Sequence, residues 1–313
     1  MAHYTKLNQE TLAQLLQQEY GMEVDSYGVL SGGSQNTNYW VKTSNQTFVL
    51  TVCEQKILAQ AEELAQLLAY LNANGFATSE VIPTIGGGLA TVFEGKPILL
   101  KSFIEGSVEK DLSPELLVTL GQQLARLHQI PAPDYLPKSL SSGIEAFDEI
   151  KLYAPESEFY VWSKETRTYI EGFLEEDMPK ALIHSDIFFN NIIIHPDGKQ
   201  TTIMDFEEAC HYYRVFDIGM MLVGSCSEGI HLNPLKTQSL LKGYQQISPL
   251  SSTEKKALQA FTVYGAAATA LWRHQNFNYV HVIPEMKDHY RAMKDLADSV
   301  RGMEAEVWFG GES

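Results

Sequence analysis

The stretch that decides how this sequence is interpreted is His184-Ser185-Asp186-Ile187-Phe188-Phe189-Asn190-Asn191. It is followed by a predicted β-hairpin, Ile192-Ile193-Ile194 and Thr202-Ile203-Met204 around the turn Pro196-Asp197-Gly198, and then by Asp205-Phe206-Glu207. Two acids and an amide are therefore expected on loops beside strands. An isolated Asp and Asn near a turn usually bond to the backbone, but that role does not predict this combination of residues in this order.

Phosphoryl transfer needs these residue types. One carboxylate orients the attacking hydroxyl and accepts its proton, and oxygen ligands hold magnesium on the nucleotide phosphates. Asp186 can fill the first role, while Asn191 and Asp205 can fill the second. The spacing 191 − 186 = 5 equals that of the Asp and Asn in the protein-kinase pattern H-R-D-x-x-x-x-N, which is followed by D-F-G. Ser185 and Glu207 depart from that pattern, so control by activation-loop phosphorylation is not implied.

Outward from this stretch, hydrophobic spacing predicts a sheet-rich N-terminal part. A first helix carries Leu12, Leu15 and Leu16 and ends at Gly21. A second helix runs from Leu58 to Gly75. The expected strands, the first three of which form an antiparallel meander, are Val24–Leu30, Asn38–Lys42, Thr47–Val52, Ala90–Phe93 and Pro97–Phe103.

After Phe103 the polar run Ile104-Glu105-Gly106-Ser107 resembles a hinge, and a mostly helical part follows. Ser113-Pro114 is an N-cap with proline at the first helical position. Further helices are expected around 216–226, 234–246, 252–274 and 285–303, and Ala181–Phe206 is the one β segment predicted in this part. The chain is therefore expected to be α+β, divided into 1–103 and 104–313.

Composition excludes several functional classes. The 39 acidic and 23 basic residues give a net charge of −16, which lacks the basic footprint of a nucleic-acid-binding protein. No apolar run approaches the ~20 residues of a membrane helix. The N-terminus has no secretory apolar core, so a cytoplasmic location is expected. Cys53, Cys210 and Cys226 are expected to be buried reduced thiols. Oligomeric state stays open, a homodimer included.

The sequence resembles the small-molecule branch of the kinase-like superfamily: aminoglycoside phosphotransferases, choline and ethanolamine kinases, and bacterial homoserine kinases. Ser31–Asn38 and Phe48–Glu54 resemble the homoserine kinase patterns G-S-x-N-[ST]-N and [FY]-x-L-T-L-x-E. The stretch at 184–191 is similar to that family's H-A-D-L-F-x-D-N. In contrast, Asp205–Ala209 and Tyr213–Gly219 resemble the choline-kinase patterns D-F-E-Y and Y-R-x-F-D-I-G.

This resemblance implies a protein-kinase-like two-lobe fold, with an antiparallel-sheet nucleotide-binding lobe (1–103) and a mainly helical catalytic and substrate-binding lobe (104–313). It implies Asp186 as the catalytic carboxylate, Asn191 and Asp205 as Mg²⁺ ligands, and His184 as the residue that shapes the catalytic loop. Asp217 would either brace that loop or cap its own helix.

The nucleotide site implied by the resemblance lies in the first lobe. Small residues there would let backbone N–H groups approach the ATP phosphates; they are Ser31, Gly32, Gly33, Ser34 and Asn36. The superfamily's strand lysine is Thr51 here, which leaves Lys42 or Lys56, together with Lys101 on the hinge strand, as candidate cations. Glu62 or Glu63 is the candidate helix acid.

Substrate contacts are expected from the second lobe, and the candidates are Glu207, Glu208, Tyr212, Tyr213, Trp272 and Arg273. Homoserine kinases carry an Arg one turn before Arg273, where this chain has Ala270, so a carboxylate anchor is either shifted or absent. We expect an ATP- and Mg²⁺-dependent kinase of a small hydroxylated amine, with homoserine favoured over choline or ethanolamine. Two alternatives stay open: a pseudokinase, suggested by Thr51, and an antibiotic phosphotransferase.

Overall fold

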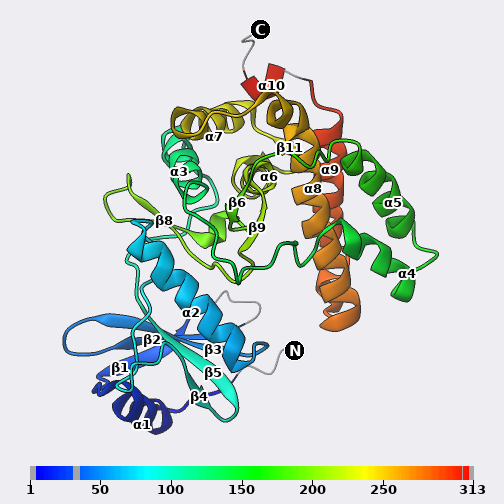
Figure 1. Cartoon of the computed structure of the whole chain (residues 1–313). Helices are drawn as coiled ribbons and strands as arrows, with labels where there is room; N and C mark the ends of the chain where they lie inside the picture. Colours follow the sequence, from blue (N-terminus) through cyan, green and yellow to red (C-terminus); the bar gives the residue numbers. More distant parts are fainter. Residues whose placement is uncertain (1–4, 31–35, 305, 310–313) are drawn as a thin grey trace. The chain divides into compact units, whose positions relative to one another are not determined.

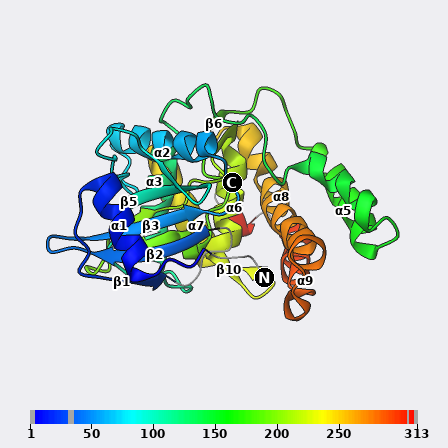
Figure 2. The same cartoon turned by 90° about the horizontal axis from the view of Figure 1, so that it is seen from below.

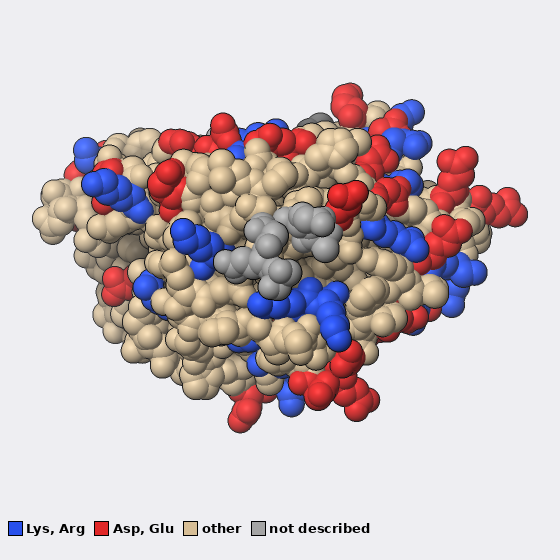
Figure 3. Space-filling model, turned by 90° about the horizontal axis from the view of Figure 1, so that it is seen from above, with Lys and Arg blue, Asp and Glu red and all other residues tan. Residues whose placement is uncertain are grey.

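A computed structural model describes residues 5–30, 36–304 and 306–309 of the chain (Figure 1). The chain divides into two compact units, Ala2–Glu105 and Gly106–Ser313, where the sequence suggested a boundary after residue 103. Within the described ranges, no helix is both long and apolar enough to cross a membrane. Figure 3 shows acidic and basic side chains interspersed over one face of the molecule.

The N-terminal unit contains the predicted antiparallel sheet. The strand order is β1-β2-β3-β5-β4, so the first three strands form the expected meander. In the register, Thr51 of β3 lies between Asn38 of β2 and Leu99 of β5. The strands are β1 (Ser26–Leu30), β2 (Asn36–Lys42), β3 (Thr47–Cys53), β4 (Thr91–Phe93) and β5 (Lys96–Ser102).

Two helices accompany this sheet on opposite sides (Figures 1 and 2). Helix α1 (Gln9–Tyr20) starts at the N-cap Asn8 and ends at Gly21 in the left-handed conformation, as predicted. Its apolar face packs against alternate strand residues such as Leu50, in one buried cluster. Helix α2 (Leu58–Ala73) lies on the other side and contacts β5.

The C-terminal unit is mainly helical. Its helices are α3 (Pro114–Leu127), α4 (Ile150–Tyr153), α5 (Glu158–Glu171), α6 (Arg214–Cys226), α7 (Pro234–Ile247), α8 (Ser252–Gln275), α9 (Tyr290–Arg301) and α10 (Glu306–Phe309). Three antiparallel strand pairs accompany them: β6 (Lys180–Ile183) with β9 (Cys210–Tyr213), β7 (Ile192–Ile194) with β8 (Thr201–Ile203), and β10 (Ser227–Glu228) with β11 (His231–Leu232). Short 3₁₀ and π turns are η1 (Ile144–Glu149), η2 (Phe189–Asn191), η3 (Asn276–Val280) and η4 (Pro284–Met286).

The structure corrects three expectations for this unit. The segment 181–206 is not its one β segment, because β9 pairs with β6 and β10 pairs with β11. Helix α5 was not predicted, since its aromatic and β-branched residues have low helix propensity; the N-cap Ser157 marks its start. The last long helix begins at Tyr290 instead of 285, after the 3₁₀ turn that starts at Pro284. The three cysteines are buried and form no disulfide with one another, as expected.

Helices α3 and α7 approach so closely that their backbones touch. A Cβ atom added at Gly121 of α3 would collide with the carbonyl oxygen of Leu240, and one added at Gly243 of α7 would collide with that of Val118. Glycine lets two helices meet at this distance because it has no side chain to separate them. This contact fixes α3 relative to α7.

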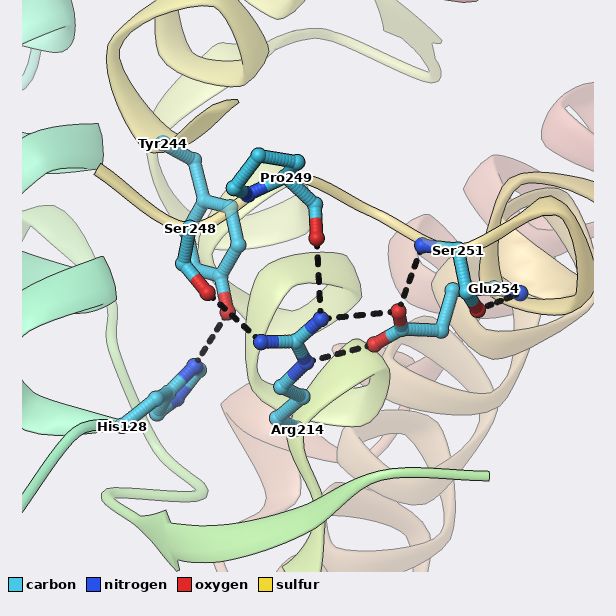
Figure 4. Close-up of polar contacts among 7 residues, drawn as sticks. All are labelled: His128, Arg214, Tyr244, Ser248, Pro249, Ser251 and Glu254. Atoms are coloured by element: carbon cyan, nitrogen blue, oxygen red, sulfur yellow. Dashed lines mark hydrogen bonds and ion pairs between the residues drawn. The ribbon is translucent and has the colours of Figure 1, made fainter. Parts of the chain in front are cut away.

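An ion pair joins the start of α6 to the start of α8 (Figure 4). Arg214 donates through Nε and Nη2 to the two carboxylate oxygens of Glu254, at 2.6 and 2.8 Å. Its remaining donors reach Ser248 Oγ at 2.6 Å and the Pro249 carbonyl at 3.1 Å. Glu254 is fully buried and also accepts the backbone N–H of Ser251, completing a capping box.

Replacing Glu254 with Gln should destabilise the protein in a pH-dependent way. Burial opposes ionisation of Glu254, but the bonds from Arg214 and Ser251 outweigh it, so the pKa lies below the ordinary 4.5. A lowered acid pKa stabilises the fold above the unfolded-state value, and this contribution is lost as the pH falls through the folded value. At pH 7 the variant should lose roughly 2–3 kcal/mol, measured by urea unfolding.

The difference between the wild type and Glu254→Gln should shrink when unfolding is repeated near pH 4. Glu165→Gln, at an exposed position of α5, is the matched control and should leave the unfolding midpoint unchanged. Equal stability of the wild type and Glu254→Gln at pH 7 would contradict the importance of the ion pair.

Candidate active site

The loop that follows β6 is held by one buried carboxylate. Asp217 of α6 accepts the backbone N–H of His184 at 2.8 Å and that of Ser185 at 2.7 Å. Ser185 has φ +69°, a strained conformation for a residue with a side chain, and its hydroxyl donates to the Glu208 carbonyl at 2.7 Å. Because Tyr213 is the N-cap of α6, Asp217 braces the loop and does not cap the helix.

Asp217 is itself oriented by a second buried contact, which no pattern in the sequence predicts. His128, the C-cap of α3, lies with Nε2 3.1 Å from the Asp217 carboxylate. Its Nδ1 lies 2.8 Å from the hydroxyl of Tyr244 in α7 (Figure 4). A neutral imidazole can donate from Nε2 and accept at Nδ1, so one tautomer satisfies both contacts. The close packing of α3 on α7 therefore positions Asp217.

His184 is fully buried, and both of its ring nitrogens face backbone groups. Nδ1 accepts the N–H of Asp186 at 3.2 Å, and Nε2 lies 2.9 Å from the carbonyl oxygen of Met204, to which it donates. The ring also lies against Phe206, with centroids 4.6 Å apart. With both nitrogens occupied, His184 ties the backbone of Asp186 to the residue that follows β8.

Asp186 is presented by this braced loop, and its side chain is exposed. The protein around it still raises the pKa of the carboxyl from 3.8 to about 6, chiefly by desolvation. Neighbouring carboxylates of Asp205 and Glu208 act in the same direction, while the Arg273 guanidinium opposes them. A carboxylate with a raised pKa is a stronger base than an ordinary aspartate, as proton acceptance requires.

Asn191 and Asp205 lie together at one end of the β7–β8 hairpin. The N–H of Met204 donates to the Asn191 carbonyl at 3.0 Å, which continues the ladder one step beyond Ile192 and Ile203. The Asn191 amide donates from Nδ2 to the Asp186 carbonyl at 2.8 Å. Its Oδ1 accepts only a long contact from the Asn190 amide, at 3.5 Å, and keeps a lone pair for a ligand. Asp205 has φ +71° and is exposed.

These two side chains fit a magnesium ion. Both offer oxygen, the donor that Mg²⁺ prefers, and proteins commonly supply only one or two such ligands beside the substrate phosphates. The described residues contain no cluster of three or more His, Cys, Asp and Glu side chains arranged to hold a metal by themselves. A site that shares its metal with a bound nucleotide agrees with both observations.

The six substrate candidates do not all lie near Asp186. Glu207 is half-buried in the turn after Asp205. Tyr213 pairs with Lys180 at the end of the β6–β9 ladder away from the loop, and its ring contacts Tyr212 and Phe261. The structure therefore does not bring Tyr213 to Asp186.

Trp272 and Arg273 lie in the last turn of α8. Trp272 is half-buried and packs edge-on against Phe277, with centroids 5.6 Å apart. Arg273 is half-buried and close enough to Asp186 for each charge to influence the pKa of the other. Glu208, another of the expected substrate contacts, also raises the pKa of Asp186.

In the N-terminal unit, the nucleotide-side candidates are only partly described. Ser31, Gly32, Gly33 and Ser34 lie outside the described residues. Asn36 starts β2, Lys42 ends it and Lys101 is on β5; by strand alternation all three belong to the sheet face opposite α1. Glu62 is half-buried on α2. Thr51, at the expected lysine position, is buried and donates to Asn38 at 2.7 Å.

Relatives with established names match most of the chain. Homoserine kinase of Agrobacterium fabrum (strain C58) is 28% identical over 272 residues, which cover 82% of each protein. Homoserine kinase of Rhodopseudomonas palustris (strain HaA2) is 26% identical over 266 residues, covering 82% of this chain and 81% of that protein.

Solved structures with low sequence identity show the fold. An amicoumacin kinase in complex with AMP-PNP, Ca²⁺ and Ami has a TM-score of 0.74 at 15% identity, covering 96% of this chain and 97% of that one. A microcompartment-associated aminopropanol kinase has a TM-score of 0.72 at 17% identity, with coverage of 96% and 99%. The chain thus has the predicted α+β, protein-kinase-like fold.

The sequence profile described as "Phosphotransferase enzyme family" matches residues 26–250. This range includes β1 to β9, the loop at 184–191 and Asp217. It spans well over half of the 313 residues. The chain is therefore a small-molecule kinase that belongs to the phosphotransferase enzyme family.

Proposed function

We propose that this enzyme transfers the γ-phosphoryl group of ATP to the hydroxyl of a small hydroxylated amine in the cytoplasm, with homoserine favoured over choline or ethanolamine. The observation that carries the proposal is the presentation of Asp186 by a braced loop, beside a hairpin end that carries Asn191 and Asp205. The homoserine kinase relatives favour homoserine among the acceptors.

In this mechanism Asp186 orients the substrate hydroxyl and accepts its proton. As the hydroxyl oxygen forms a bond to the γ-phosphorus, the bond from that phosphorus to the bridging oxygen breaks and ADP leaves. Asp205 and the Oδ1 of Asn191 would hold Mg²⁺, which supplies positive charge for the phosphates. His184 and Asp217 keep the loop in the conformation that presents Asp186.

An amino alcohol is the second candidate acceptor. The segment Asp205–Ala209 resembles choline kinases, and Asp205 and Glu208 surround Asp186 with negative charge that would attract an ammonium group. The aminopropanol kinase among the structural neighbours is in line with this candidate. Coupled ADP-release assays with MgATP and homoserine, choline, ethanolamine and one aminoglycoside separate these acceptors.

Replacing Asp186 with Asn should abolish most turnover without removing nucleotide binding. The amide cannot accept the proton of the hydroxyl, so kcat should fall by roughly 100-fold or more, while the Kd for MgATP stays within about twofold. Asp197→Asn, in the exposed turn of the same hairpin, is the control and should retain wild-type kcat. Normal turnover by Asp186→Asn would contradict its role as the base.

Replacing Asp217 with Asn should lower kcat through the position of the loop. One of the two acceptor oxygens becomes an NH₂ group that faces a backbone N–H or His128, so a buried donor loses its partner. We expect a loss of about 1–3 kcal/mol in unfolding free energy and a drop in kcat of at least about tenfold.

The kinetic part of this prediction is measured well below the melting temperature, where the variant is folded, with KM for ATP determined in parallel. A fall in kcat with unchanged KM is the signature of a mispositioned Asp186. A variant that loses stability but keeps wild-type kcat would show that Asp217 serves the fold alone.

A further inference from the structure

Arg273 differs from Arg214, another half-buried arginine of the C-terminal unit, in making no hydrogen bond or ion pair with the described residues. Arg214 uses its guanidinium donors on Glu254, Ser248 and Pro249. Arg273 is also half-buried, yet it makes no hydrogen bond or ion pair with any residue in the part of the chain that the structure describes. Its pKa is lowered by desolvation, which Asp186 opposes.

An arginine in this state is suited to a ligand. The guanidinium has five N–H donors in a planar fork and no acceptor, so it needs oxygen atoms as partners. Leaving such donors unpaired in a partly desolvated position costs free energy, and a planar carboxylate satisfies two of them at once. The unmet donors of Arg273 therefore match an anion with two oxygens in one plane.

The surroundings of Arg273 connect that anion to the reaction. Arg273 and Asp186 influence each other electrostatically but form no ion pair. Both charged groups therefore remain able to bind a ligand. Asp205 and Glu208 add negative charge near Asp186. Because Asp205 is assigned to Mg²⁺, the same molecule can present a hydroxyl to Asp186, an ammonium group to Glu208 and an anionic group to Arg273.

We propose that Arg273 binds a carboxylate of the phosphoryl acceptor and so selects hydroxy amino acids over amino alcohols. This inference rests on the proposed function and adds a specificity-determining residue to it. The proposal also places the carboxylate-binding arginine in this chain. It is Arg273, one helical turn after Ala270, the position where homoserine kinases carry an arginine. Arg rather than Lys suits the role because its fork matches a carboxylate in two places.

L-Homoserine and 3-aminopropan-1-ol test the proposal because they differ only in the carboxylate. Calorimetric titration of the full chain should give a Kd for L-homoserine about 10- to 100-fold lower than for 3-aminopropan-1-ol. In Arg273→Met the Kd for L-homoserine should rise while the Kd for 3-aminopropan-1-ol stays the same. The two Kd values should then differ by no more than about threefold. Arg273→Lys should be intermediate, because it keeps the charge without the fork.

The control variant is Arg126→Met, which removes an exposed arginine at the end of α3 and should leave the ratio unchanged. The MgATP affinity of Arg273→Met should equal that of the wild type. Equal affinities of the wild type for the two compounds, a ratio that survives in Arg273→Met, or binding of neither compound would overturn the proposal. Loss of MgATP binding instead would assign Arg273 to the nucleotide phosphates.

Turnover separates failure of this inference from failure of the proposed function. The ratio of kcat/KM for the two acceptors should follow the ratio of affinities in each variant, with Asp186→Asn as the blank. Efficient phosphorylation of 3-aminopropan-1-ol or ethanolamine by the wild type would retain the proposed kinase and discard the carboxylate anchor. Absence of Asp186-dependent phosphorylation of every acceptor would contradict the proposed function itself.

Discussion

The carboxylate of Asp217 accepts the N–H groups of two consecutive residues, and the active loop depends on this interaction. It holds Ser185 at positive φ, a conformation that is unfavourable for a residue with a side chain unless its surroundings impose it. The resulting turn directs the chain from β6 to Asp186. His128 and Tyr244 hold the carboxylate in turn, so two helices distant in sequence support one loop.

The charges near Asp186 have separate tasks because their partners differ. Asp217 and Glu254 are fully buried and bonded, and so belong to the framework. Asp186 and Asp205 are exposed, and Arg273 has no bonded partner among the described residues. The groups whose bonding capacity the fold leaves unused are thus gathered around the loop, where substrate and metal would use it.

The sequence predicted the parts of the fold that local patterns encode. The caps at Gly21 and Ser113 and the turn at 196–198 have strong local signals, and the structure contains them. Strand β9 has four residues without alternation and forms through pairing with β6, so no local pattern announces it. The contact of His128 with Tyr244 joins residues 116 positions apart. The spacing within one loop was enough to indicate Asp186 and Asn191. A contact between residues far apart in the chain, such as that of His128 with Tyr244, leaves no pattern in a single sequence.

The glycine contact between α3 and α7 ties helix packing to the reaction. His128 ends α3 and Tyr244 follows Gly243 in α7, so a shift of either helix would move the contacts that hold Asp217. Gly121 and Gly243 have no side chain that could take part in the chemistry. Evolutionary selection on catalysis would nevertheless act on them, and among relatives a larger residue at one position would require compensating change along the opposite helix.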